Sequence, residues 1–401
     1  METSLAGIRV LDLTQVQAGP YASMILGDLG AEIIKIEPPQ GDFTREFPFY
    51  AYQGESYYYL AFNRNKKSMV LDLKTKEGKA IFYQLVKIAD VVIDNFNPGV
   101  VERLGVDYNT LKGINCQIIS CSITGFGPTG PYQGRRSYDL IAQAMSGAMT
   151  LTGEPGRPPV RCGISIADMA GGVYAALGIL AAYIARQQTG EGQKVDISLL
   201  DGMIALLSYF VSYYFLSGDI PGPQGSGHFS VIPYGAFPTK DGYIAIAEGW
   251  PRVAQVLGIE QYIDDPRFAT RAERLKYKGE LYAILSQAFG REETETWVEL
   301  LNAQGIAAAP VNTIAKALGD PQVLHQDMVI TLDHALGGKI KLAGNPIKMS
   351  ATPDEIRKAF ESPPLLGQHT EEILSDLLGY PAERLARLRE EGITRSTTTG
   401  A

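Results

Sequence analysis

The first third of the chain alternates short apolar runs with stretches of helical periodicity, and this alternation restricts the fold more than any other feature. The runs "IRVLDL" (8–13) and "AEIIKIEP" (31–38) are typical of buried strands. Between them, "PYASMILGDLG" (20–30) predicts a helix with Pro20 in its first turn. A strand–helix–strand unit of about 30 residues opens many nucleotide-binding sheets.

The same alternation continues beyond this unit. Further strands are expected over 68–74, 90–96 and 117–123, with helices over 75–88 and 99–111 between them. Strands that alternate with helices in this way form a parallel sheet covered on both faces. The sequence therefore predicts an α/β fold with a Rossmann-like parallel sheet. Helices are then expected over 138–149 and 168–186, and "MIALLSYFVSYYFL" (203–216) belongs to one long apolar helix.

The segment "SGDIPGPQGSGH" (217–228) marks the clearest boundary, because six of its twelve residues are Gly or Pro. After it, "PYGAFPTKDGYIAIAEG" (233–249) predicts two strands joined by a turn, and helices are expected near 250–257 and 277–303. We therefore expect a large domain whose first part is 1–216, a linker and mobile loop at 217–228, a smaller α+β domain at 229–319, and a C-terminal part at 320–401 that returns to the large domain. The large domain is then discontinuous.

Composition excludes several classes of protein. A formal net charge of −8 argues against a nucleic-acid partner. The three cysteines and four histidines have no metal-ligand spacing, so no metal site is expected, and a reducing, cytoplasmic location is favoured. The start of the chain lacks the pattern of a signal peptide, and the apolar run 203–216 is too short to span a bilayer, so no membrane partner is expected.

Two loops are candidates for ligand binding. "GFGPTG" (125–130) matches the dinucleotide pattern G-x-G-x-x-G, but prolines and a glycine over 128–134 oppose the helix that the pattern requires. This disfavours a nicotinamide or flavin oxidoreductase and favours a tight loop that closes a pocket. "TQVQAGP" (14–20), after the first strand, is the better cradle for an anion, with a plain turn as the alternative.

Asp168 stands among small residues at the start of an alanine-rich helical run, in "GISIADMAGG" (163–172). One interpretation is an N-cap. The other is a reactive carboxylate, since a helix N-terminus favours the ionised form and small neighbours leave room for a ligand. The scattered histidines offer no general base, so carboxylate nucleophilic catalysis fits the chain.

The chain resembles the class III coenzyme A transferases of the CaiB/BaiF type, which include formyl-CoA:oxalate transferases. The resemblance extends over nearly the whole length. It rests on "VLDLTQVQAGPYAS", "GAEIIKIEPPQGD", "FNRNKKSMVLDLK", "VVIDNFNPGVVERLG", "SITGFGPTGPY", "YDLIAQAMSG", "TGEGQKVDISLLD" and "PPLLGQHTEEIL". It implies that Asp168 is the catalytic residue and that the fold is an interlocked-ring dimer, a homodimer or a heteromer with a paralogous chain.

The resemblance also implies binding residues. Contacts with coenzyme A are expected at Val16, Gln17, Ala18, Leu71, Asp72, Lys74, Asn95, Phe96, Asn97, Arg103, Arg136, Ser137, Tyr138 and Asp139. A mobile loop over the active site is expected at Gly225, Ser226, Gly227 and His228. CoA thioesters are then substrates, and no permanently bound cofactor is expected.

The reaction implied is CoA transfer from an acyl-CoA to a free carboxylic acid, through aspartyl anhydrides and an aspartyl-CoA thioester. Formyl-CoA transferases have an arginine where this chain has Pro38, and a run of glycines where it has "GPQGSGH". An acid bulkier than oxalate is therefore expected, with succinyl-CoA as a possible donor. Arg64, Arg135 and Arg136 are each candidates for a second substrate carboxylate or for a phosphate.

Two alternatives remain. The related 2-methylacyl-CoA racemases use a histidine beside an acidic residue, but Tyr138 precedes Asp139 here, and tyrosine is a poor base at neutral pH. A non-catalytic CoA-binding subunit of a heteromeric transferase is the other alternative, and the presence of Asp168 opposes it.

Overall fold

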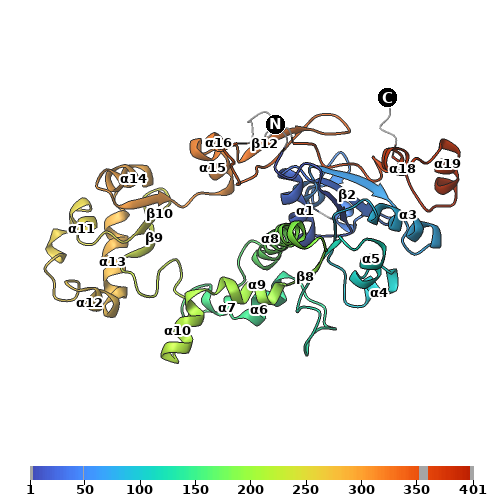
Figure 1. Ribbon diagram of the computed structural model, residues 1–401. Helices are drawn as coiled ribbons and strands as arrows, with labels where there is room; N and C mark the ends of the chain where they lie inside the picture. Colours follow the sequence, from blue (N-terminus) through green and yellow to red (C-terminus); the bar gives the residue numbers. More distant parts are fainter. Residues whose placement is uncertain (1–2, 48, 352–359, 398–401) are drawn as a thin grey trace. The chain divides into compact units, whose positions relative to one another are not determined.

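The computed structural model describes residues 3–47, 49–351 and 360–397 (Figure 1). The chain forms two compact units. We call the unit formed by Met1–Ser146, Gly163–Ser212 and Leu324–Ala401 the large unit, and the unit formed by Gly147–Cys162 and Tyr213–Val323 the small unit. The domain limits predicted from the sequence, at 216, 228 and 319, stay a prediction.

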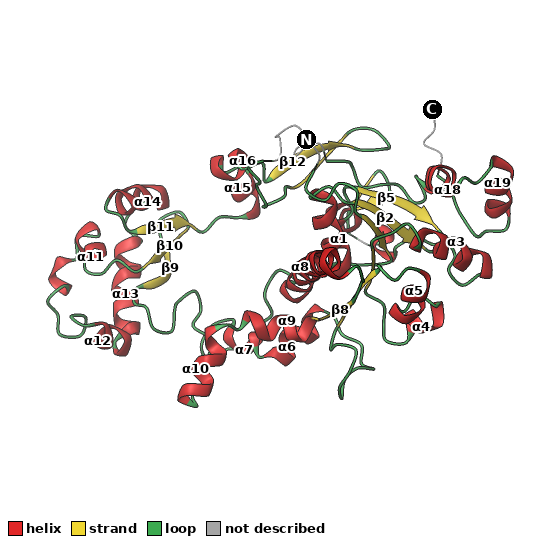
Figure 2. Cartoon of the chain, viewed as in Figure 1, coloured by secondary structure: helices red, strands yellow, loops and turns green. Residues whose placement is uncertain are grey.

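The large unit is built on a six-stranded parallel sheet with the strand order β5-β2-β1-β6-β7-β8 (Figure 2). The apolar runs of the sequence form these strands, and most of their residues are buried because helices cover both faces. The α/β prediction is thus confirmed. The strands are β1 (Arg9–Asp12), β2 (Glu32–Glu37), β5 (Lys66–Val70), β6 (Val91–Asp94), β7 (Ile119–Thr124) and β8 (Lys194–Ser198).

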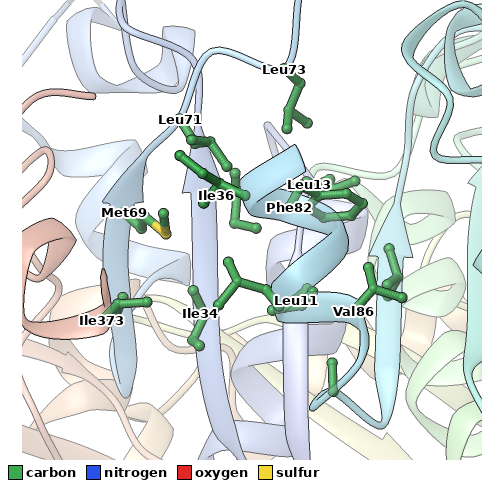
Figure 3. Packing of buried hydrophobic residues seen from close by; sticks show 14 of the residues in the cluster. Leu11, Leu13, Ile34, Ile36, Met69, Leu71, Leu73, Phe82, Val86 and Ile373 are labelled. Carbon is green, nitrogen blue, oxygen red and sulfur yellow. The ribbon is translucent and has the colours of Figure 1, made fainter. Parts of the chain in front are cut away.

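Two groups of helices enclose this sheet. On one face, α3 and α5 and the C-terminal α18 and α19 share an apolar core with the strands, in which Leu11, Phe82 and Ile373 are buried (Figure 3). On the other face, α1 and α8 pack against each other and against the strands. The helices of this unit are α1 (Ala18–Asp28), α2 (Tyr57–Phe62), α3 (Lys76–Val86), α4 (Val100–Leu104), α5 (Tyr108–Ile114), α6 (Asp139–Ser146), α8 (Ile166–Thr189), α9 (Leu199–Leu206), α18 (Thr370–Leu378) and α19 (Ala382–Glu390).

The small unit has an antiparallel sheet with the order β11-β10-β9, and its helices bury Phe237, Phe289 and Trp297 against it. The predicted strand pair around the Lys-Asp-Gly turn is confirmed. Its elements are α7 (Ala148–Leu151), β9 (Tyr234–Pro238), β10 (Tyr243–Ala247), α11 (Arg252–Val256), η2 (Glu260–Tyr262), α12 (Arg271–Lys276), α13 (Lys278–Phe289), α14 (Thr294–Ala303), β11 (Ala307–Pro310) and α15 (Ile314–Leu318). The other elements of the described residues are η1 (Phe43–Glu46), β3 (Ala51–Tyr52), β4 (Glu55–Ser56), α10 (Tyr209–Ser217), α16 (Pro321–His325), β12 (Val329–Asp333) and β13 (Lys339–Ala343).

Several helices predicted as continuous are interrupted. The helix expected over 99–111 is two helices, because Gly105 adopts a left-handed conformation with φ 71° and ends α4. The predicted long apolar helix is also divided, into α9 and α10, which differ in direction by 71°.

Within the described residues, α8 is long and apolar enough to cross a bilayer by length and composition, as a buried core helix also is.

Candidate active site

A cavity of about 220 Å³ opens in the large unit at the carboxyl ends of β1, β6 and β7. This is the edge at which open α/β sheets bind ligands. The loops after these three strands line the cavity, together with the first turn of α8, which contributes Asp168. The predicted site residues that line it are Val16, Gln17, Ala18, Asn95, Phe96, Asn97, Ser137, Tyr138 and Asp168.

The turn between β1 and α1 is held rigidly. The Asn95 side chain accepts a hydrogen bond from the backbone N–H of Gln15 at 2.9 Å and donates one to its carbonyl at 2.6 Å. Val16 has a positive φ of 69°, which is uncommon for a β-branched residue. A Cβ at Gly19 would lie 2.3 Å from Thr14 Cγ2, so only glycine allows α1 to start this close to the turn.

A cluster of buried charged side chains supports the same turn by donating hydrogen bonds to its backbone carbonyls. Lys35 Nζ donates to the Thr14 carbonyl at 2.7 Å and pairs with Asp42 at 3.0 Å. Lys66 Nζ pairs with Asp12 at 3.1 Å and donates to the Pro20 carbonyl at 3.0 Å. Each ion pair has no solvent-exposed side-chain surface, and burial lowers the pKa of Lys66 to about 8. This cluster was not predicted from the sequence, although a lysine inside the apolar run "AEIIKIEP" was its signal.

Asp168 is the third residue of α8, whose N-cap is Ser165. The N-cap interpretation of Asp168 is therefore wrong. Another carboxylate satisfies the start of the helix: Asp139 Oδ1 accepts a hydrogen bond from the backbone N–H of Ala167 at 2.9 Å. Asp139 is buried, and its second oxygen accepts a hydrogen bond from Gln143 at 2.7 Å.

The environment of Asp168 disfavours its charge. Burial, followed by the negative charge of Asp139, raises the pKa of Asp168 to about 7. A helix N-terminus favours the ionised form of a carboxyl group, but burial and a like charge outweigh that effect at Asp168. A carboxyl group with such a pKa in a cavity is typical of a functional site.

Tyr58 lies in the same surroundings and was not predicted from the sequence as a site residue. Its hydroxyl donates to Gln17 Oε1 at 2.8 Å, and Gln17 Nε2 lies 3.3 Å from the sulfur of Met169, the neighbour of Asp168. Burial and then the charge of Asp168 raise the pKa of Tyr58 to about 12, so the hydroxyl stays protonated and keeps donating. The Gln17 amide is therefore oriented beside the first turn of α8. The aromatic run "YYY" (57–59) is too common a pattern to have revealed this role.

A second cavity of about 520 Å³ lies beside the first and shares Gln15 and Phe96 with it. Four further predicted CoA contacts line it: Leu71, Asp72 and Lys74, which follow β5, and Arg103 on α4. All the predicted contacts except Arg136 and Asp139 thus line two adjoining cavities within one unit. Lys74, Lys79 and Arg103 form a cationic region in the second cavity, whereas Asp168 lines the first.

Other predicted residues lie elsewhere. Arg136 lines none of the described cavities, and Asp139 caps α8 rather than lining the cavity. The loop Gly225–His228 belongs to the small unit, where Lys278 Nζ donates to Gln224 Oε1 at 3.0 Å. The role of this loop over the active site stays a prediction. Among the described residues, no group of three or more His, Cys, Asp or Glu side chains is placed to hold a metal ion.

Comparison with known proteins identifies the class to which this site belongs. Residues 5–370 match the family model "CoA-transferase family III". The chain is 39% identical over 396 residues to succinyl-CoA:glutarate CoA-transferase of Homo sapiens, an alignment that covers 97% of this chain and 89% of that protein. It is 40% identical over 385 residues to succinate–glutarate CoA-transferase of Agrobacterium fabrum, covering 93% and 95%.

A solved structure agrees with these sequence matches. A CaiB/BaiF family protein from Brucella suis superimposes with a TM-score of 0.86 and 37% identity, covering 94% of this chain and 100% of that one. The chain therefore belongs to CoA-transferase family III and is an enzyme of that family, as the resemblance indicated.

Proposed function

We propose that this enzyme transfers CoA from succinyl-CoA to a free dicarboxylic acid such as glutarate, with Asp168 as the covalent carrier. One observation carries the assignment to Asp168: it is the single carboxylate among the described residues that line the cavity. The names of the human and Agrobacterium relatives support this choice of substrates: both include glutarate, together with succinyl-CoA in the human name and succinate in the Agrobacterium name.

The first half of the proposed reaction moves CoA onto the enzyme. The ionised Asp168 attacks the thioester carbon of succinyl-CoA, so that a C–O bond forms, the C–S bond breaks and CoA leaves as a thiolate. The product is a mixed anhydride of succinate and the aspartyl group. The thiolate then attacks the aspartyl carbonyl, which releases succinate and leaves CoA on Asp168 as a thioester.

The second half reverses these steps with the acceptor. The acceptor carboxylate attacks the aspartyl thioester, releases the thiolate and forms a second anhydride. The thiolate attacks the acceptor side of this anhydride, which yields the new acyl-CoA and regenerates the carboxylate. The proton balance is zero, because only carboxylates and a thiolate act as nucleophiles and leaving groups. Gln17, held by Tyr58, offers an amide N–H to the oxyanion of each step.

We further propose that two copies of the chain assemble into an interlocked homodimer. In a single chain, the apolar residues Val173, Leu177 and Ile184 of α8 are 48%, 60% and 62% exposed, respectively. Apolar side chains at this spacing on a long helix need a cover, and a second copy would supply it. Light scattering that reports a monomer would contradict this assembly, and activity only after addition of a different family III chain would favour a heteromer.

The test of the proposed function combines turnover with detection of the intermediate. Purified enzyme is mixed with succinyl-CoA and glutarate, and the CoA products are identified by mass. We expect glutaryl-CoA, and a CoA adduct on the peptide that contains Asp168. The matched variant D168N is expected to lose exchange by about 10³-fold or more, because an amide forms no anhydride.

Two results would overturn the mechanism: full exchange by D168N, or rapid exchange without an adduct in the wild type. Deuterium incorporation at C2 of a branched acyl-CoA, with no acceptor acid present, would instead favour the racemase alternative.

A further inference from the structure

The cavity that contains Asp168 has one cationic side chain among its described lining residues, that of Arg135. The carbon of its guanidinium group lies 4.0 Å from the centre of the Tyr132 ring. Among the described residues, several arginines form ion pairs with carboxylates, but Arg135 is not one of them. Its positive charge is therefore available to an anion in the cavity.

The other candidate arginines are placed differently. Arg64 is buried in an ion pair with Asp28 at 2.6 Å and also donates to the Ala343 carbonyl at 2.7 Å, so its charge is used within the fold. Arg136 lines none of the described cavities. The structure thus distinguishes between three arginines that the sequence left equivalent.

The loop that carries Arg135 turns back to the sheet edge from which it starts. A Cβ at Gly125 would lie 2.1 Å from Ser137 Cβ, so the glycine lets the end of the loop touch the end of β7. Within the loop, the Arg135 N–H donates to the Tyr132 carbonyl at 2.9 Å. This packing keeps Arg135 in the wall that also contains Thr124 and Gly125.

We propose that Arg135 is the specificity residue that binds the distal carboxylate of the dicarboxylate substrate while the reacting carbonyl lies at Asp168. This inference rests on the proposed function. Asp168 is already negative when it reacts, so a second carboxylate in the same cavity is repelled unless a cation compensates it. A guanidinium group pairs with a carboxylate through two parallel hydrogen bonds, whereas a neutral acyl chain gains nothing from it.

The test compares two donors that differ only at the distal end of the acyl chain. Succinyl-CoA has a carboxylate where butyryl-CoA has a methyl group, and the CoA part is identical. In R135M we expect kcat/KM for succinyl-CoA to fall about 10- to 100-fold, while the value for butyryl-CoA changes less than about threefold. R135K, which keeps the charge without the planar fork, should recover part of the loss. If the wild type does not turn over butyryl-CoA, the inhibition constant of butyryl-CoA, measured against succinyl-CoA, is compared between the wild type and R135M instead.

A second variant supplies the comparator. R103M changes a residue that lines the second cavity and is expected to contact CoA itself, so it should weaken both donors by the same factor. Retained binding or turnover of butyryl-CoA by R135M also shows that this variant is folded. An equal loss with both donors in R135M, or no loss with either, would overturn the assignment of Arg135. Failure of the wild type to use any dicarboxylyl-CoA would overturn the proposed function itself, and the inference with it.

Discussion

Replacing Asp168 with asparagine is expected to make the protein more stable at alkaline pH while it abolishes exchange. The pKa of Asp168 is raised from 3.8 to about 7 in the folded protein. The folded state therefore holds the proton more tightly than the unfolded state does. The stability that this proton contributes is complete below about pH 4 and is lost as the pH rises through about 7. Asparagine has no proton to lose, so D168N avoids the loss.

The size of the effect follows from the shift. Three pKa units correspond to about 4 kcal/mol, at 1.36 kcal/mol per unit. About two of those units lie between pH 5 and pH 8.5, which sets an upper value near 3 kcal/mol for the change over that window. Because Asp168 is partly exposed, solvent screening reduces the expected value to about 1–2 kcal/mol.

The assay is urea denaturation of the wild type and D168N at pH 5 and pH 8.5, at one fixed protein concentration. The measured quantity is the difference in the free energy of unfolding between the two proteins, and it should grow in favour of D168N as the pH rises. D107N is the matched control: burial raises the pKa of Asp107, but hydrogen bonds from Thr110 and from nearby backbone N–H groups together outweigh it and lower that pKa. The contribution of Asp107 is lost only in acid, so its difference should stay flat over this window. A D168N difference that is also flat, or that shrinks, would refute the reasoning.

Further predictions concern the pH profile and the support of the β1–α1 turn. The value of kcat/KM for succinyl-CoA should rise with an inflection near pH 7, since Asp168 reacts in its ionised form, and a profile that is level from pH 5.5 to 8.5 would contradict this. D139N should move that inflection to lower pH by removing the neighbouring charge; an unchanged inflection would count against the coupling. K35M leaves the buried Asp42 without its cation and should lower the free energy of unfolding by about 3–5 kcal/mol in urea titrations; a change below about 1 kcal/mol would show that the pair is not needed. G19A forces Thr14 to move, so it should lower the free energy of unfolding by about 1–3 kcal/mol and weaken the binding of CoA measured by calorimetry. Binding of CoA at wild-type strength would place this turn outside the CoA site.

The sheet could be predicted from the sequence because buried parallel strands need continuous apolar runs, and β1, β2 and β6 lie within the predicted runs. Helix interruptions were harder to predict. The breaks at Gly105 and between α9 and α10 depend on local backbone conformation, which periodicity does not report. The limits of α8, predicted as 168–186 and observed as Ile166–Thr189, decided whether Asp168 caps the helix or lies inside its first turn.

The candidate site divides in a similar way. The segments that line the cavity carry family motifs, so the resemblance indicated most of them. The contributions of Lys35, Tyr58 and Asp139 depend on contacts between segments far apart in the sequence, such as the hydrogen bond from Tyr58 to Gln17. No spacing rule links these positions, and only the folded arrangement shows which carboxylate is near Asp168.

The two influences that raise the pKa of Asp168 also bear on the proposed intermediates. Burial and the charge of Asp139 disfavour a negative carboxylate, and both an anhydride and a thioester remove that charge. Each acylated form is therefore favoured over the free carboxylate by an amount comparable to the pKa shift, up to about 4 kcal/mol. In water the hydrolysis of such species is strongly downhill, so an environment that penalises the carboxylate brings the intermediates closer in free energy to the substrates. On this argument D139N, which removes one of the two influences, should lower the fraction of enzyme that carries CoA at steady state. Mass spectrometry of the intact protein measures that fraction directly. An unchanged or larger fraction in D139N would show that the pKa of Asp168 and the stability of its acylated forms are not linked.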